Sequence, residues 1–163
     1  MIDVKNCVEN LLEFTEQLNS KYELSKTVDE TYFEPGVMEN LEQYKGEYNE
    51  QENVVTIRVD VKGLRYDNRT QNLERITVGD EVQIIRDEGN MYNSNNFTIF
   101  NKNESLGNLP AELCNVLAPL YDTGYAVILS AKASYVEKIR ERSRYAKQGV
   151  LFVELNIKLR AVI

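Results

Sequence analysis

The residues best suited to chemistry in this sequence are arginines, tyrosines and asparagines in or beside predicted loops, where a hydrophobic core does not need them. They are Arg65, Tyr66, Arg86, Asn90, Tyr92, Asn93, Asn95 and Asn108. A guanidinium can bind a phosphate, and a neighbouring phenol ring can stack on a base. Together with loop amides, these groups suit the end of a single nucleic-acid strand, whose terminal base is free to stack. The alternative is structural, because Asn-rich loops form turns and tyrosines fill the ends of small barrels.

The sequence lacks the residues that most other kinds of functional site require. The 163-residue chain has no histidine, which excludes Ser-His-Asp and Cys-His catalysis and zinc sites built on imidazole. Its two cysteines, Cys7 and Cys114, are too few for a cysteine-rich metal site or a disulfide scaffold, and they favour a reducing compartment. No phosphate-binding loop and no dinucleotide fingerprint is present. Asp87 and Glu88 are adjacent and would point to opposite faces of a strand. We therefore expect a binding protein without enzymatic activity, cofactor or metal.

The charge divides the chain into two parts. The net charge is -7, but residues 1–50 hold four basic and twelve acidic residues, whereas residues 51–163 hold fifteen basic and fourteen acidic ones. Within the second part, residues 132–147 carry six basic and two acidic residues. This charge balance argues against a protein that binds nucleic acid through positive charge over its whole surface, and it leaves a local basic segment for that purpose.

The elements that must position these residues follow from hydrophobic spacing. Apolar residues three and four apart predict a helix over the first twenty residues, and another from Pro110 to a stop at Gly124, with Asn108 as a possible cap. Residues 70–77 predict one or two helical turns. Alternation with a period of two, or short apolar runs, predict strands over residues 53–62, 82–85, 97–100, 125–136 and 151–160, with a short paired segment near Leu106.

This pattern predicts an α+β fold: a small OB-like or antiparallel β-barrel of about six strands, one or two short helices and an N-terminal helix. We expect two regions, an acidic helical extension over residues 1–50 and a barrel domain over 51–163. The apolar stripe of the N-terminal helix would cover the main domain, a second copy of the chain or another protein. No signal peptide or membrane-length apolar run is visible, so we expect a cytoplasmic protein without a membrane partner.

Several motifs occur in the order of a known family. They are Gly63-Leu64-Arg65-Tyr66, then Val78-Gly79-Asp80 before a strand ending in Arg86, then Asn90 to Phe97, then Leu106-Gly107-Asn108-Leu109-Pro110, and the helix end from Leu117 to Gly124. The run from Asn90 is similar to the family pattern Asn-x-Tyr-Asp-x-Asn-Ala-Ile. The run from Leu106 is similar to Leu-Gly-aromatic/His-x-Pro. By these motifs, residues 54–160 resemble a HIRAN domain.

The resemblance implies a modified oligonucleotide-binding barrel that holds the 3′ end of single-stranded DNA, in DNA repair or replication. By motif position, Arg65 and Arg86 belong to the nucleic-acid site, with Arg65 on a phosphate, and Tyr66 and Tyr92 pack the terminal nucleotide. Asn93 stands where the family has an acid that hydrogen-bonds the 3′ hydroxyl, and Asn95 shapes the loop.

Asn108, like Ala111, replaces a position where some relatives place a helper for phosphate. The alternative is a protein-interaction or regulatory module on the same barrel with a degenerate DNA site. Burial of Tyr66 and Tyr92, without an open pocket beside Arg65, would favour that alternative.

Overall fold

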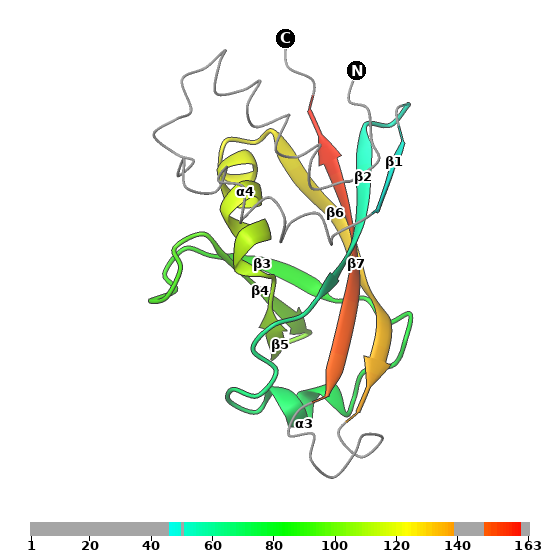
Figure 1. Ribbon diagram of the computed structural model, residues 1–163, viewed down its shortest axis with the longest axis vertical. Coiled ribbons are helices and arrows are strands. Elements are labelled where there is room, and N and C mark those ends of the chain that lie inside the picture. Colours follow the sequence, from blue (N-terminus) through cyan, green and yellow to red (C-terminus); the bar gives the residue numbers. More distant parts are fainter. Residues whose placement is uncertain (1–45, 50, 139–148, 161–163) are drawn as a thin grey trace.

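The computed structural model describes residues 46–49, 51–138 and 149–160. In chain order the elements are β1 (Gly46–Asn49), β2 (Val54–Asp60), α3 (Arg69–Leu73), β3 (Gln83–Asp87), β4 (Asn96–Asn101), β5 (Glu104–Asn108), α4 (Ala111–Asp122), β6 (Ala126–Glu137) and β7 (Val150–Leu159) (Figure 1). The N-terminal helix predicted over the first twenty residues lies outside the described residues, as does most of the basic segment that follows β6.

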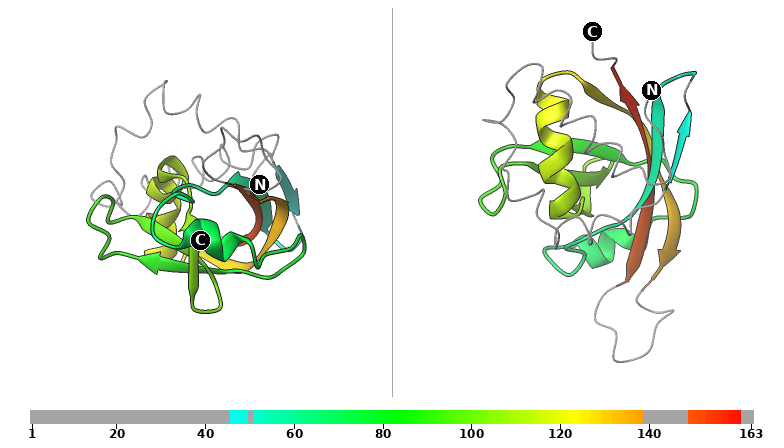
Figure 2. Two further views of the ribbon diagram at one scale, coloured as in Figure 1. Left: turned by 90° about the horizontal axis from the view of Figure 1, so that it is seen from below. Right: turned by 45° about the horizontal axis from the view of Figure 1, so that its top comes forward.

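The described residues form two antiparallel sheets. The larger has the strand order β1-β2-β7-β6, and the smaller has the order β3-β4-β5. The strands of the smaller sheet run across those of the larger one, α4 lies at one end and α3 at the other (Figures 1 and 2). The prediction of a small, sheet-rich antiparallel domain with two short helices is confirmed. The closure of these sheets into a barrel stays a prediction.

The alternating strands β2 and β7 pair with their apolar sides toward the core. The register places Ile57 opposite Leu155 and Val59 opposite Val153, and all four side chains are fully buried. Because the period of a strand is two, the intervening residues all face outward. One side of this sheet therefore supplies the core, and the side chains of the other side are partly or fully exposed.

Backbone hydrogen bonds join the two sheets at two places. The N–H of Val82, just before β3, donates to the carbonyl of Ala131 on β6 over 3.0 Å. At the other edge, Lys62 and Asn108 exchange N–H to carbonyl bonds of 2.9 and 2.8 Å. The second junction matters for the site because it fixes the chain after β2 against the end of β5.

Gly107 allows the end of β5 to lie directly against the chain after β2. A Cβ added at Gly107 would lie 2.6 Å from the carbonyl oxygen of Lys62 and would also collide with the side chain of Val61. Only a glycine permits this approach. The glycine of the Leu106–Pro110 motif is thus explained by backbone packing.

The helices differ from their predicted limits in detail. α4 ends close to Gly124, which has a positive φ of 82° and follows the last helical turn, as predicted. The expectation that Asn108 caps this helix is wrong, because the N-cap residue is Pro110, without a side-chain cap, and Asn108 belongs to β5. α3 covers five residues, so it is shorter than the predicted segment.

The sequence did not predict β1. Residues 46–49 fall in the segment assigned to the acidic extension, but they pair with β2, with Gly46 opposite Ile57 and Asn49 opposite Val54. The main sheet thus begins at Gly46, five residues before the predicted start of the barrel domain at residue 51. No helix in the described part of the chain is long and apolar enough to cross a membrane.

Candidate nucleic-acid interface

A pocket of about 750 Å³ brings together three segments that are far apart in sequence. They are the chain from the end of β2 to the start of α3, the loop between β3 and β4, and the chain from the end of β5 into α4. The lining residues are Lys62, Tyr66, Asp67, Arg69, Asn90, Tyr92, Asn93, Asn96, Asn108, Leu109, Ala111 and Glu112. Five of the eight predicted site residues therefore lie around one hollow.

Tyr66 forms one side of the pocket and is held by Arg65. The Arg65 guanidinium lies 5.0 Å from the centre of the Tyr66 ring, and its Nη2 donates to the Tyr66 hydroxyl over 2.9 Å. Tyr66 is 54% exposed. Arg65 does not line the pocket, but it lies beside it and makes no ion pair with any described carboxylate. Its charge is therefore not neutralised by this part of the protein.

The loop between β3 and β4 is built by asparagine side chains that imitate the backbone. Oδ1 of Asn90 accepts the backbone N–H groups of both Tyr92 and Asn93 at 3.0 Å, which is an Asx turn. Oδ1 of Asn93 accepts the N–H of Asn95, also at 3.0 Å. This turn directs Tyr92 outward at the rim of the pocket, where it is 92% exposed.

A buried asparagine on α4 attaches this loop to the rest of the domain. Oδ1 of Asn115 accepts Nδ2 of Asn93 at 3.1 Å and Nδ2 of Asn95 at 3.2 Å. Asn115 was not among the predicted residues, although its signal is visible as one amide within an apolar helix, between Cys114 and Val116. Asn95 does not line the pocket, and its backbone N–H and side-chain amide are held by Asn93 and Asn115.

Asp87 is the centre of a second hydrogen-bond network under the pocket. Its Oδ2 accepts Nδ2 of Asn90 at 3.1 Å, Nδ2 of Asn96 at 3.2 Å and Oγ1 of Thr98 at 3.3 Å. Burial raises the pKa of Asp87, but these three hydrogen bonds and the nearby Arg86 charge outweigh it, and the net pKa lies below the ordinary value. Asp87 is thus ionised at neutral pH and orders two asparagines that line the pocket.

Arg69 and Asn108 form the floor next to Gly63. Arg69 donates Nε to Oγ of Ser105 over 2.8 Å, Nη1 to the carbonyl of Gly63 over 3.2 Å, and Nη2 to Oδ1 of Asn108 over 3.5 Å. Gly63 has a φ of 74°, and a Cβ there would lie 2.9 Å from the Arg69 guanidinium. The glycine of the Gly-Leu-Arg-Tyr motif thus provides both a left-handed backbone conformation and space for the Arg69 side chain.

Arg86 is not brought into the pocket. Its guanidinium forms two hydrogen bonds of 3.0 Å with the carboxylate of Asp122 and donates to the carbonyls of Ser94 and Asn96. Its side chain is only 13% exposed. The hydrogen bond with Asp122 raises the pKa of Arg86 further, against the effect of burial. Arg86 therefore joins α4 to the β3–β4 loop.

Placement thus separates the predicted residues into two groups. Tyr66, Asn90, Tyr92, Asn93 and Asn108 line the pocket, while Arg65, Asn95 and Arg86 support it from outside. Sequence reasoning missed the remaining polar lining, above all Lys62, Arg69 and Asn96. Lys62 lies just after β2 in an isolated bridge with Asn108, and Asn96 is the first residue of β4. Only the pairing of these segments brings the two side chains to this place.

The described residues contain no group of three or more carboxylate or cysteine side chains placed to hold a metal ion. The cysteine that the structure describes, Cys114, is fully buried in α4, and burial raises its thiol pKa to about 12. A thiol with such a pKa is protonated at neutral pH and is a poor nucleophile.

The family comparison agrees with the motifs. The model of the HIRAN domain matches residues 54–152, so the chain belongs to the HIRAN domain family. No curated protein matches the sequence significantly.

The chain is similar to two solved structures. The HIRAN domain of human HLTF shows 24% identity and a TM-score of 0.46, over 66% of this chain and 83% of that chain. A protein from Lactobacillus plantarum shows 21% identity and a TM-score of 0.50, over 64% of this chain and 96% of that chain.

Proposed function

We propose that this domain binds the 3′ end of single-stranded DNA in the pocket between Tyr66 and Tyr92, as a binding module without catalytic activity, in DNA repair or replication. One observation supports this above all: Tyr66 is far along the chain from the adjacent pair Tyr92 and Asn93, yet all three line one open pocket. Both rings are exposed rather than buried, which favours a ligand over a purely structural role.

The pocket offers a terminal nucleotide three kinds of contact. The rings of Tyr66 and Tyr92 can stack on a base, which contributes roughly 1–3 kcal/mol per base. Arg65 carries a guanidinium beside Tyr66 for the phosphate. Oδ1 of Asn93 accepts one backbone N–H and keeps a lone pair for a hydroxyl. Because few phosphates meet a cation, we expect a shallow salt dependence, with about one to three ions released.

Fluorescence anisotropy with short oligonucleotides tests the proposal. An oligonucleotide with a free 3′ hydroxyl should bind at least about fivefold more tightly than the same sequence with a 3′ phosphate. Tyr92→Ala should lower the affinity at least fivefold, since it removes about 1 kcal/mol or more of stacking. The matched control is Met91→Ala, because Met91 is 86% exposed next to Tyr92 but does not line the pocket. Equal binding of both oligonucleotides would count against recognition of the end.

The substitution Asn93→Asp should raise the affinity for the free 3′ end, whereas Tyr92→Ala should lower it. A carboxylate would restore a charge-assisted hydrogen bond to the 3′ hydroxyl, and such bonds contribute about 1 kcal/mol more than neutral ones. We expect tighter binding of the free 3′ end and weaker binding of the phosphorylated end. If the amides of Asn115 and Asn95 both turn, Nδ2 of Asn115 donates to the new carboxylate and to Oδ1 of Asn95, and the loop keeps its anchor. A variant that weakens both ligands equally would contradict the assigned role of Asn93.

If the wild-type protein binds neither oligonucleotide, the protein-interaction reading of the same domain replaces this proposal.

A further inference from the structure

One arginine in the pocket has no charged partner among the described residues. Four charged residues line the pocket: Lys62, Asp67, Arg69 and Glu112. The ammonium of Lys62 lies 3.1 Å from a carboxylate oxygen of Asp60, whereas Arg69 makes no ion pair with any described carboxylate. Arg69 is half-buried, and burial of an unpaired charge costs free energy. A negatively charged group of a ligand would offset this cost.

Neutral acceptors hold the Arg69 guanidinium in place. Its three hydrogen bonds go to the hydroxyl of Ser105, the carbonyl of Gly63 and the amide oxygen of Asn108. A guanidinium has five N–H groups, so one N–H on each Nη has no partner among the described residues. Two N–H groups of one planar guanidinium can bind two oxygens of a phosphate. The side chain is therefore fixed, charged and able to bind an anion.

The hydrogen-bond network under the pocket contains a carboxylate, but two amides separate it from Arg69. Nδ2 of Asn96 donates to Oδ2 of Asp87 and to Oδ1 of Asn108, each over 3.2 Å. Oδ1 of Asn108 in turn accepts from Arg69. Asp87 thus orders the acceptor that Arg69 uses without forming an ion pair with Arg69 itself.

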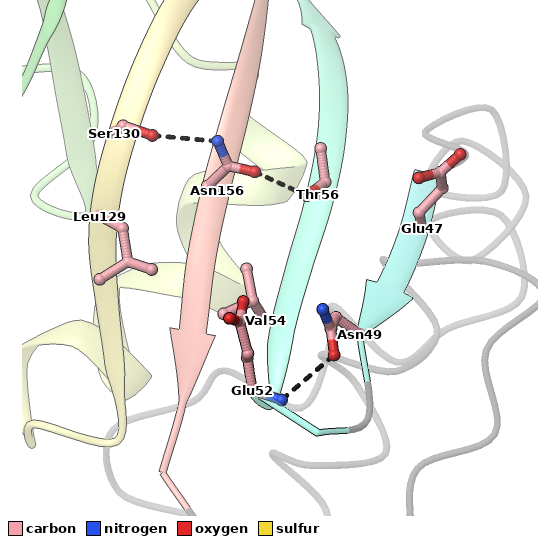
Figure 3. Close-up of a pocket in the computed structure, with 8 residues that line it drawn as sticks. All are labelled: Glu47, Asn49, Glu52, Val54, Thr56, Leu129, Ser130 and Asn156. Atoms are coloured by element: carbon pink, nitrogen blue, oxygen red, sulfur yellow. Dashed lines mark hydrogen bonds between the residues drawn. The ribbon is translucent and has the colours of Figure 1, made fainter.

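A second hollow, on the larger sheet, lacks such a cation. Its volume is about 660 Å³, and Asn156 links Thr56 to Ser130 there by hydrogen bonds of 2.6 and 2.9 Å (Figure 3). The carboxylates of Glu47 and Glu52 belong to its lining, and none of the described residues around it is basic (Figure 3). Negative charge repels phosphates, so the pocket that contains Arg69 suits a nucleic-acid strand better.

We propose that Arg69 binds the 5′ phosphate of the terminal nucleotide and that Arg65 binds the next phosphate along the strand. This inference rests on the proposed function, to which it adds a second phosphate contact and the order of the two contacts. Arg69 lines the pocket, whereas Arg65 lies outside it, beside Tyr66. A strand whose end occupies the pocket therefore passes Arg69 first and Arg65 second.

The test introduces one neutral linkage at a time into a short oligonucleotide with a free 3′ hydroxyl. A methylphosphonate, in which a methyl group replaces a charged oxygen, stands either at the last linkage or at the linkage before it. In fluorescence anisotropy, each neutral linkage should lower the affinity of the wild-type protein at least about fivefold, because it removes a charge-assisted contact. Arg69→Gln should weaken binding of the unmodified oligonucleotide by a similar factor. In this variant the neutral last linkage should change the affinity less than about twofold, whereas the effect of the linkage before it remains.

Two other arginine variants are the matched controls. Arg65→Gln should show the reverse pattern, so that the effect of the last linkage remains and the effect of the linkage before it is lost. Arg75→Gln should retain both effects, because Arg75 is exposed, paired with Glu104 and outside the pocket. If Arg69→Gln does not fold, Ser105→Ala provides a milder change. It removes the acceptor of Nε and should reduce the effect of the last linkage at least about twofold.

The outcomes separate this inference from the proposed function. If the wild-type protein prefers the free 3′ end but tolerates a neutral last linkage, or if Arg69→Gln leaves the effect of that linkage unchanged, the inference alone is wrong. An effect of the last linkage that depends on Arg69, in a protein that binds a 3′ phosphate equally well, would support the phosphate contact and contradict recognition of the end. Equal losses with Arg69→Gln and Arg75→Gln would show that only net charge matters. Absence of binding to any oligonucleotide would overturn both proposals.

Discussion

Replacement of Asp87 by asparagine isolates the electrostatic support of the pocket. The substitution keeps the shape of the side chain and an oxygen acceptor, but it removes the negative charge that receives hydrogen bonds from Asn90, Asn96 and Thr98. Hydrogen bonds to a charged acceptor contribute about 1 kcal/mol more than neutral ones. Three such bonds set an upper limit of roughly 3 kcal/mol, and partial exposure of the carboxylate reduces it. We expect a loss of about 1–2 kcal/mol in the free energy of unfolding at pH 7.

The stability difference between wild type and Asp87→Asn should depend on pH in a predictable direction. Because the folded pKa of Asp87 lies below its unfolded value, the carboxylate stabilises the fold above about pH 4 and loses this effect as the pH falls through the folded pKa. The difference in stability between wild type and Asp87→Asn should therefore be largest near neutral pH and shrink below pH 4. Other carboxylates titrate in both proteins and cancel in the difference.

Urea denaturation at a series of pH values, followed by circular dichroism, measures this difference. A variant as stable as wild type at pH 7, or a difference that stays constant down to pH 3, would refute the assigned role of Asp87. The same variant should bind a 3′-end oligonucleotide several-fold more weakly, because Asn90 and Asn96 line the pocket and lose part of their order.

Three further predictions follow from packing. Gly107→Ala should destabilise the fold by about 2 kcal/mol or more, because its Cβ would collide with the backbone of the neighbouring segment; thermal melting measures this. In a Cys7→Ser background, Cys114 should react with a thiol reagent at pH 8 only in denaturant, since its pKa is about 12 and it is buried; reaction at the rate of a free thiol in the native protein would contradict this. Arg86→Gln should lower the free energy of unfolding by about 1–2 kcal/mol because it removes the guanidinium hydrogen bonds to Asp122 and to the carbonyls of Ser94 and Asn96, while the 40% exposed Asp122 regains water; a binding loss without a stability loss would instead place Arg86 in the interface.

Local patterns were sufficient for the elements with a clear period. The strand β7 and the helix end at Gly124 could be predicted because each depends on residues that are neighbours in the sequence. An alternating apolar pattern indicates the strand, and a glycine with positive φ ends the helix, whatever these segments pack against. The short strand β1 was missed because its four residues carry no alternation of their own and depend on pairing with β2.

The candidate site divides in the same way. Sequence alone determined that the Asn90–Asn95 run forms a polar loop, because Asx turns are made by neighbours along the chain. The exposure of Tyr92 was decided by the tertiary structure. Only the tertiary structure decided which arginines serve which purpose. Arg86 is bound by Asp122 from a distant helix, whereas Arg69 reaches Asn108 across the floor of the pocket. Sheet register and helix packing bring each arginine to its partner. The spacing of residues along the sequence does not predict either contact.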